Sequence, residues 1–140
     1  MDNGNFTILC VDDEATPLYF RKLVLEKNGF HVLTVPSAMQ AIQLLANTRV
    51  DLVLSDILMP EMPGTELLQR LRKSHPKLPI ILVSGLNEVP PEAAQADLFI
   101  SKLEGPIVMC EKIRQVLQQH QSSHETGSAN ANASSQSAAL

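Results

Sequence analysis

Short apolar runs alternate with longer amphipathic stretches along most of this chain, and this alternation limits the possible folds more than any other feature. Three of the runs are nearly continuous in Ile, Leu and Val, which is typical of strands covered on both faces. The runs occupy residues 6–11, 31–35, 52–55, 79–83 and 98–100. Because amphipathic stretches separate them, the order predicts an α/β fold with a five-stranded parallel sheet between two layers of helices.

The stretches between the runs carry signals for the start and end of helices. Thr16-Pro17 places a capping residue before a proline at the first helical position, and Asn28-Gly29 ends that helix. Ser37 precedes an apolar stripe with the spacing of one helix face. Thr65-Glu66 opens a third helix, and Pro106 opens the last one. These signals predict four full helices and leave only residues 92–96 as a helical segment between the fourth and fifth strands.

Composition bounds the partners and the location of the protein. A length of 140 residues fits one compact domain. The net charge of −4 argues against contact with a nucleic-acid backbone. No apolar run is long enough to cross a membrane, and the first residues lack the pattern of a signal peptide. We therefore expect a cytoplasmic protein that binds neither nucleic acid nor membrane. Cys10 and Cys110 are expected to be buried, free thiols.

The composition changes near residue 120. Residues 121–140 contain six Ser and five Ala, and Leu140 is their only large apolar side chain. Such a segment cannot offset its ordering entropy by burial. We expect a folded unit at residues 5–120 and a disordered Ser/Ala-rich tail at 121–140.

Polar residues lie at the ends of four of the five predicted strands. Asp12-Asp13-Glu14 follow the first strand and Asp56 the third, while Ser84-Gly85 end the fourth and Lys102 follows the fifth. In a parallel sheet these ends share one edge, so Asp12, Asp13 and Asp56 should converge. Converging carboxylates repel one another unless a cation joins them, and oxygen ligands favour Mg²⁺. A carboxylate neutralised in this way could attack a phosphoryl group whose oxygens the metal and Lys102 stabilise.

The residues at the strand ends resemble the receiver domain of two-component response regulators. The resemblance covers the whole folded unit in the right order and rests on Val11-Asp12-Asp13-Glu14, residues 52–60 with Asp56 and Met59-Pro60, Pro63-Gly64, residues 81–85 and Phe99-Ile100-Ser101-Lys102. It implies a flavodoxin-like, CheY-like doubly wound α/β fold with strand order 2-1-3-4-5.

The resemblance also implies a function and roles for individual residues. Asp56 would take a phosphoryl group from a histidine kinase or phosphotransfer protein and become 4-aspartylphosphate in a phosphorelay. Asp13 and Asp56 would hold Mg²⁺, with Asp12 acting largely through water and Leu58 contributing its carbonyl. Lys102 would contact the phosphoryl group, and Ser84 and Phe99 would move as the switch. Such a domain is a signalling module and no enzyme beyond its own phosphorylation and dephosphorylation. It would act on a downstream effector protein or output domain, and could dimerise.

Two departures from the family pattern change the expectations locally. Leu103 follows Lys102 where the family usually has proline, so we expect a trans bond or a reshaped loop, a last helix beginning at Pro106, and slower phosphorylation. The interval from Ser84 to Lys102 is short and contains Pro90-Pro91, which predicts a shortened or missing fourth helix and a modified output face.

The apolar residues at positions 58 and 86 bear on the lifetime of the phosphoryl group. Leu58 and Leu86 each lie two residues beyond a strand-end site residue. They are expected to restrict water and lengthen that lifetime, unless they only cap the core.

The same residues disfavour two other functions and leave one alternative open. A phosphohydrolase with an aspartate nucleophile would need a carboxylate where Leu58 stands. A flavin protein would need a loop rich in Gly, Ser or Thr in place of Asp12-Asp13-Glu14. The alternative that stays open is a degenerate receiver that binds partners without phosphorylation. Leu103 favours this alternative, whereas the presence of all the strand-end polar residues argues against it.

Overall fold

The computed structural model describes residues 6–85 and 90–137 of the chain, with side chains through residue 121. Five parallel strands form one sheet in the order β2-β1-β3-β4-β5, as the sequence predicts. The strands are β1 (Thr7–Val11), β2 (His31–Val35), β3 (Leu52–Asp56), β4 (Ile80–Ser84) and β5 (Leu98–Ser101). Asp12 and Asp13 directly follow β1 and Asp56 ends β3, so these three acids lie at the carboxyl-end edge of the sheet.

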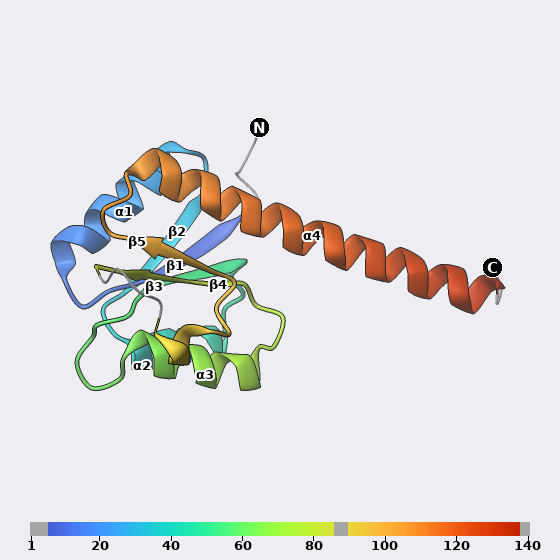
Figure 1. The fold of residues 1–140 in the computed structure, drawn as a ribbon, viewed down its shortest axis with the longest axis horizontal. Coiled ribbons are helices and arrows are strands. Elements are labelled where there is room, and N and C mark those ends of the chain that lie inside the picture. The colour runs from blue at the N-terminus through green and yellow to red at the C-terminus, as the bar shows by residue number, and fades with distance from the viewer. Residues whose placement is uncertain (1–5, 86–89, 138–140) are drawn as a thin grey trace.

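Helices cover both faces of this sheet, which makes three layers (Figure 1). α1 (Ala15–Lys27) and α4 (Pro106–Ser137) lie over one face, and α2 (Ala38–Leu45) and α3 (Gly64–Ser74) lie over the other. Alternate residues of each strand point to opposite layers. In β1, Ile8 packs in the core beneath α1 and α4, and Leu9 packs in the core beneath α2 and α3. The predicted doubly wound fold is thus confirmed.

The predicted helix starts are correct to within two residues. The Ser37 hydroxyl accepts a hydrogen bond from the Gln40 amide at 3.1 Å and caps α2, as expected. α1 begins at Ala15 and so includes Thr16-Pro17, because the Leu18 amide already donates to the Glu14 carbonyl at 3.3 Å. A proline near the start of a helix gives up no hydrogen bond within the helix, so the earlier start costs little.

The connection between β4 and β5 is short, as predicted. Its described part, residues 90–97, contains a three-residue 3₁₀ helix, η1 (Pro91–Ala93), in place of a fourth full helix. Arg72 of α3 fastens this connection: its guanidinium donates to the Leu78 carbonyl at 2.6 Å and to the Asp97 carboxylate at 2.7 Å. It also donates to the Gln95 carbonyl at 2.9 Å and 3.1 Å. Leu86 lies outside the described residues.

The peptide bond after Lys102 is trans, one of the two outcomes that Leu103 predicts. All described peptide bonds are trans, and α4 begins at Pro106. The Leu103 amide donates to the Ser101 hydroxyl at 3.1 Å. Glu104 accepts from the Ser101 amide at 3.3 Å and from the Lys112 ammonium at 2.7 Å. The Lys112 hydrogen bond lowers the pKa of Glu104, against a smaller opposing effect of burial. Contacts within the loop therefore hold it without a proline.

The last helix continues beyond the expected end of the folded unit. α4 runs to Ser137, and Figure 1 shows its second half projecting away from the sheet. The sequence predicts disorder from residue 121, whereas the structure continues α4 through this segment. The division into a domain at 5–120 and a tail at 121–140 stays a prediction. No helix in the described part of the chain is long and apolar enough to span a membrane.

Both cysteines are buried and free, as predicted. Burial raises the pKa of the Cys10 thiol to about 12, despite the nearby Arg21 charge, which lowers it. Burial also raises the pKa of Cys110. Both thiols are therefore protonated at neutral pH.

Candidate functional site

Three carboxylates meet at the carboxyl ends of the two central strands. The β1–β3 register pairs Val11 with Ser55, so the next residues along the two strands, Asp12 and Asp56, lie side by side. Asp13 follows Asp12, and one oxygen atom from each of the three residues lies within 4.8 Å of the other two. The convergence expected from the sequence is therefore present, and it offers oxygen donors only, the kind that Mg²⁺ prefers.

The three carboxylates differ in burial, and this difference sets their electrostatics. Asp12 is fully buried and Asp56 is 3% exposed, whereas Asp13 lies on the surface. Burial raises the pKa of Asp56, and the negative charge of Asp12 raises it further. Lys102 and Arg21 act in the opposite direction without cancelling this rise. Ionised Asp56 is thus unfavourable in the isolated protein, and a bound cation would relieve it.

The Lys102 side chain contacts the Asp56 carboxylate. Its Nζ lies 3.3 Å from both Asp56 Oδ1 and Oδ2. The Lys102 amide donates to the Ser84 carbonyl at 2.7 Å, which continues the β4–β5 pairing by one residue and fixes where the side chain leaves the backbone. The ammonium is therefore in place to contact Asp56 although Leu103 follows it.

The other predicted site residues differ in burial: Ser84 is buried, Phe99 is half-buried and Leu58 is exposed. Ser84 ends β4 and is buried; the β3–β4 register places it one residue beyond the partner of Asp56. Phe99 is half-buried on β5 and packs against the core beneath α2 and α3. The Leu58 side chain is 65% exposed in the loop after β3. Leu58 therefore does not cap the core.

A glycine supports the backbone of Asp56 from behind. The Gly64 amide donates to the Ile57 carbonyl at 2.8 Å, which folds the loop of residues 57–63 back onto the end of β3. A Cβ atom on Gly64 would collide with the Asp56 carbonyl oxygen. This close approach explains the glycine of the Pro63-Gly64 pair, which the sequence pattern alone does not explain.

Arg21 is a site residue that sequence reasoning missed. It lies on α1, is 8% exposed, and donates from Nη1 to Asp12 Oδ2 at 2.8 Å. The other Asp12 oxygen accepts the Glu14 amide at 2.9 Å. The signal in the sequence is its spacing: Leu18, Arg21 and Leu25 are the buried residues of α1, so the arginine occupies a position on the apolar face.

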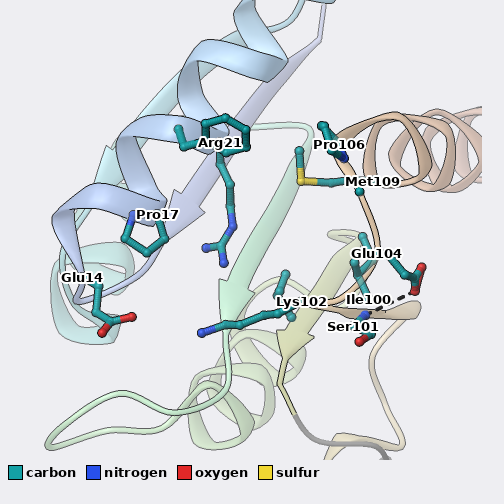
Figure 2. A pocket seen from close by; sticks show the side chains of 12 residues that line it. Glu14, Pro17, Arg21, Ile100, Ser101, Lys102, Glu104, Pro106 and Met109 are labelled. Atoms are coloured by element: carbon teal, nitrogen blue, oxygen red, sulfur yellow. Dashed lines mark hydrogen bonds between the residues drawn. The ribbon is translucent and has the colours of Figure 1, made fainter.

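Arg21 and Lys102 also line a common cavity of about 330 Å³ between the start of α1 and the β5–α4 connection. Figure 2 shows Arg21 descending from α1 and Lys102 extending from the end of β5, with their charged ends toward the same side of the cavity as Glu14. The other walls are largely apolar and are formed by Pro17, Phe20, Val83, Ile100, Pro106 and Met109.

Comparisons with known proteins identify one family. Residues 8–114 match the sequence profile of the response regulator receiver domain. The chain is 33% identical to the response regulator GtcR of Aneurinibacillus migulanus over 112 residues, which are 77% of this chain and 46% of GtcR. It is 38% identical to the sensor kinase CckA of Brucella abortus over 88 residues, which are 61% of this chain and 9% of CckA. The chain thus spans less than half of the length of either relative.

Solved structures share the fold. A CheY-like receiver domain protein from Methanospirillum hungatei has a TM-score of 0.78 and 31% identity, over 84% of this chain and 98% of that one. The response regulator TrrA from Thermotoga maritima, solved in complex with Mg²⁺ and BeF, has a TM-score of 0.76 and 26% identity, over 79% of this chain and 98% of that one.

Proposed function

This chain belongs to the response regulator receiver domain family of two-component signalling, and from this membership we propose that it is an active, Mg²⁺-dependent phosphoacceptor that takes a phosphoryl group on Asp56. The observation that carries the proposal is the position of the Lys102 ammonium, 3.3 Å from both oxygens of Asp56, where Asp12 and Asp13 also converge. A merely structural aspartate would have no need of a second and third carboxylate beside it.

The proposed reaction is a transfer between two side chains. An Asp56 oxygen forms a bond to the phosphorus of a phosphohistidine on the donor protein, while the P–N bond breaks and the imidazole nitrogen keeps the electron pair. Lys102 is placed to stabilise the equatorial phosphoryl oxygens. Burial deprives the Asp56 carboxylate of the water that would stabilise its charge, which raises its pKa and makes it the stronger nucleophile once a cation favours its ionised form.

The residues present fit a hard divalent cation. We propose that Asp13, Asp56 and the Leu58 carbonyl hold Mg²⁺ directly and that Asp12 contributes through water. The bound ion would neutralise the carboxylates and the developing charge on the phosphoryl oxygens.

The proposed switch follows from the added charge. Aspartyl phosphate carries about one more negative charge than aspartate at neutral pH. In the proposal, buried Ser84 moves toward the new phosphoryl oxygens and half-buried Phe99 follows. The protein would receive its phosphoryl group from a histidine kinase or phosphotransfer protein in the cytoplasm and pass the signal to an effector protein or output domain, as a monomer or dimer. Its chemistry would end at its own phosphorylation and dephosphorylation.

Exposure to acetyl phosphate and Mg²⁺ tests the proposal by intact-protein mass. The wild-type chain should gain one phosphoryl group, and Asp56→Asn should gain none. Glu66→Gln, which removes an exposed carboxylate on α3, is the matched control and should behave as the wild type. A wild-type chain that gains nothing, with or without Mg²⁺, would instead support the phosphorylation-independent interaction module.

A further inference from the structure

The ion pair between Arg21 and Asp12 sits inside the site and satisfies a carboxylate that the proposed function assigns to the metal. Both Asp12 oxygens have protein partners, the Arg21 guanidinium at 2.8 Å and the Glu14 amide at 2.9 Å. Asp12 is fully buried and Arg21 nearly so. A water molecule through which Asp12 contacts a divalent cation must therefore share the Asp12 oxygens with a hydrogen-bonded positive charge.

Arg21 also changes the charge balance of the site. Three carboxylates with Lys102 alone leave two negative charges uncompensated, which one divalent ion would neutralise. With Arg21 included, only one negative charge is left, so the same ion would give the site an excess positive charge. When Asp56 carries a phosphoryl group, the additional negative charge restores neutrality with the ion bound.

From these two observations we infer that Arg21 is an internal competitor of the divalent cation for the negative charge of Asp12. It lowers the affinity of the unphosphorylated site for Mg²⁺ and so ties occupation by the metal more closely to phosphorylation. This inference rests on the proposed function, because it presumes that the carboxylates bind the ion.

The cavity next to Arg21 provides space for the displaced guanidinium. It has a volume of about 330 Å³, and Arg21 lies in its wall together with Glu14 (Figure 2). The exposed Glu14 carboxylate offers a second anionic partner to a guanidinium that leaves Asp12. The other acid in the cavity wall, Glu104, is already paired with Lys112 at 2.7 Å. In the inference, Glu14 is therefore the partner that receives the guanidinium within the same cavity.

Calorimetric titration of the full chain with MgCl₂ tests the inference. Arg21→Met keeps an apolar stem of similar length and removes the charge, so its dissociation constant for Mg²⁺ should fall by about fivefold or more relative to the wild type. Arg70→Met is the matched control, since Arg70 pairs with Glu66 on the surface of α3, and its dissociation constant should equal that of the wild type. An unchanged dissociation constant in Arg21→Met would overturn this inference alone. Absence of Mg²⁺ binding in all three proteins would overturn the proposed metal site and this inference together.

Arg21→Met leaves a buried carboxylate without its partner and could unfold in the absence of metal. A measurement on the wild-type chain avoids this problem. The side-chain Nε–H resonance of Arg21 in a ¹H–¹⁵N spectrum should shift as Mg²⁺ saturates the site, while that of Arg70 should not. An Arg21 resonance that stays in place at saturation would show that the ion pair persists and would contradict competition.

Discussion

Gly64 packs directly against the backbone of Asp56. A Cβ atom at Gly64 would collide with the Asp56 carbonyl oxygen and lie 3.0 Å from the Ile57 Cα atom. Both obstacles are backbone atoms of the central strand and the residue after it, so neither can rotate away. The loop after β3 and the first turn of α3 thus determine where the Asp56 side chain begins.

We predict that Gly64→Ala destabilises the protein by about 2 kcal/mol or more, because the added methyl group must push α3 away from β3. The free energy of unfolding in urea measures the effect. Gly105→Ala is the control: a Cβ at Gly105 meets no atom within 4 Å, and the change should stay within about 0.5 kcal/mol. Equal effects of the two substitutions would contradict the steric explanation.

The raised pKa of Asp56 predicts how stability depends on pH in the absence of metal. Because the folded state binds this proton more tightly than the unfolded state, stability falls as the pH rises from the ordinary value of 3.8 through the raised one, and is level above it. Asp56→Asn has no carboxyl group to ionise at this position, so its free energy of unfolding should not fall in this way. It should exceed that of the wild type at neutral pH in EDTA, and the difference should disappear in acid.

Unfolding curves of the wild type and Asp56→Asn at a series of pH values, with and without Mg²⁺, measure this difference. Mg²⁺ should reduce the difference in the free energy of unfolding between the two proteins. A bound ion stabilises the folded state, and only the wild type retains all three carboxylates to bind it. Glu66→Gln serves as the control, since its carboxylate is exposed on α3. A gap between the wild type and Asp56→Asn that is independent of pH would rule out the ionised carboxylate as its cause.

Arg72 should be the main support of the short β4–β5 connection. Arg72→Met removes the hydrogen bonds to the Leu78 and Gln95 carbonyls and the ion pair with Asp97. We expect a loss of about 1–3 kcal/mol in the free energy of unfolding. Arg70→Met, which breaks an exposed ion pair on the same helix, should cost about 0.5 kcal/mol or less. Equal losses in the free energy of unfolding for the two variants would contradict the role of Arg72 in holding the connection.

Leu58 is expected to lengthen the life of the phosphoryl group on Asp56. Its exposed side chain lies two residues beyond Asp56 and offers no group that could orient an attacking water. Leu58→Asn supplies such a group and should accelerate the loss of the phosphoryl group, followed by intact-protein mass after removal of acetyl phosphate. Leu23→Asn, an exposed leucine on α1, should leave the rate unchanged.

The segment after residue 120 should contribute little to stability. Its composition is poor in apolar residues, and an isolated stretch of helix in water is marginal without tertiary packing. We predict that a chain ending at His120 melts within about 2 °C of the full chain. Rapid hydrogen exchange of the amides in residues 121–137 would agree with the disorder expected from the sequence, whereas strong protection would contradict it.

The sequence predicted the sheet because the apolar runs and the helix start and stop signals between them indicate the same alternation of strands and helices. The runs that form β3 and β4 are fully buried, and polar residues after the first and third runs mark the same edge, so the convergence of Asp12 and Asp56 follows from parallel pairing. Arg21 was missed because its role depends on where α1 packs over β1. Gly64 was read only as part of a motif, because a close approach of two backbones becomes visible only in three dimensions.

The position of Asp56 in the sheet decides which parts of the protein can respond to a covalent change. β3 is hydrogen-bonded to β1 on one side and to β4 on the other, so Asp56 could shift only if two ladders broke together. β5 has one neighbour, and the described part of the connection before it, residues 90–97, holds a single 3₁₀ turn. A modification at Asp56 is therefore accommodated more easily at an edge strand such as β5, which carries half-buried Phe99, than by a shift of β3 itself.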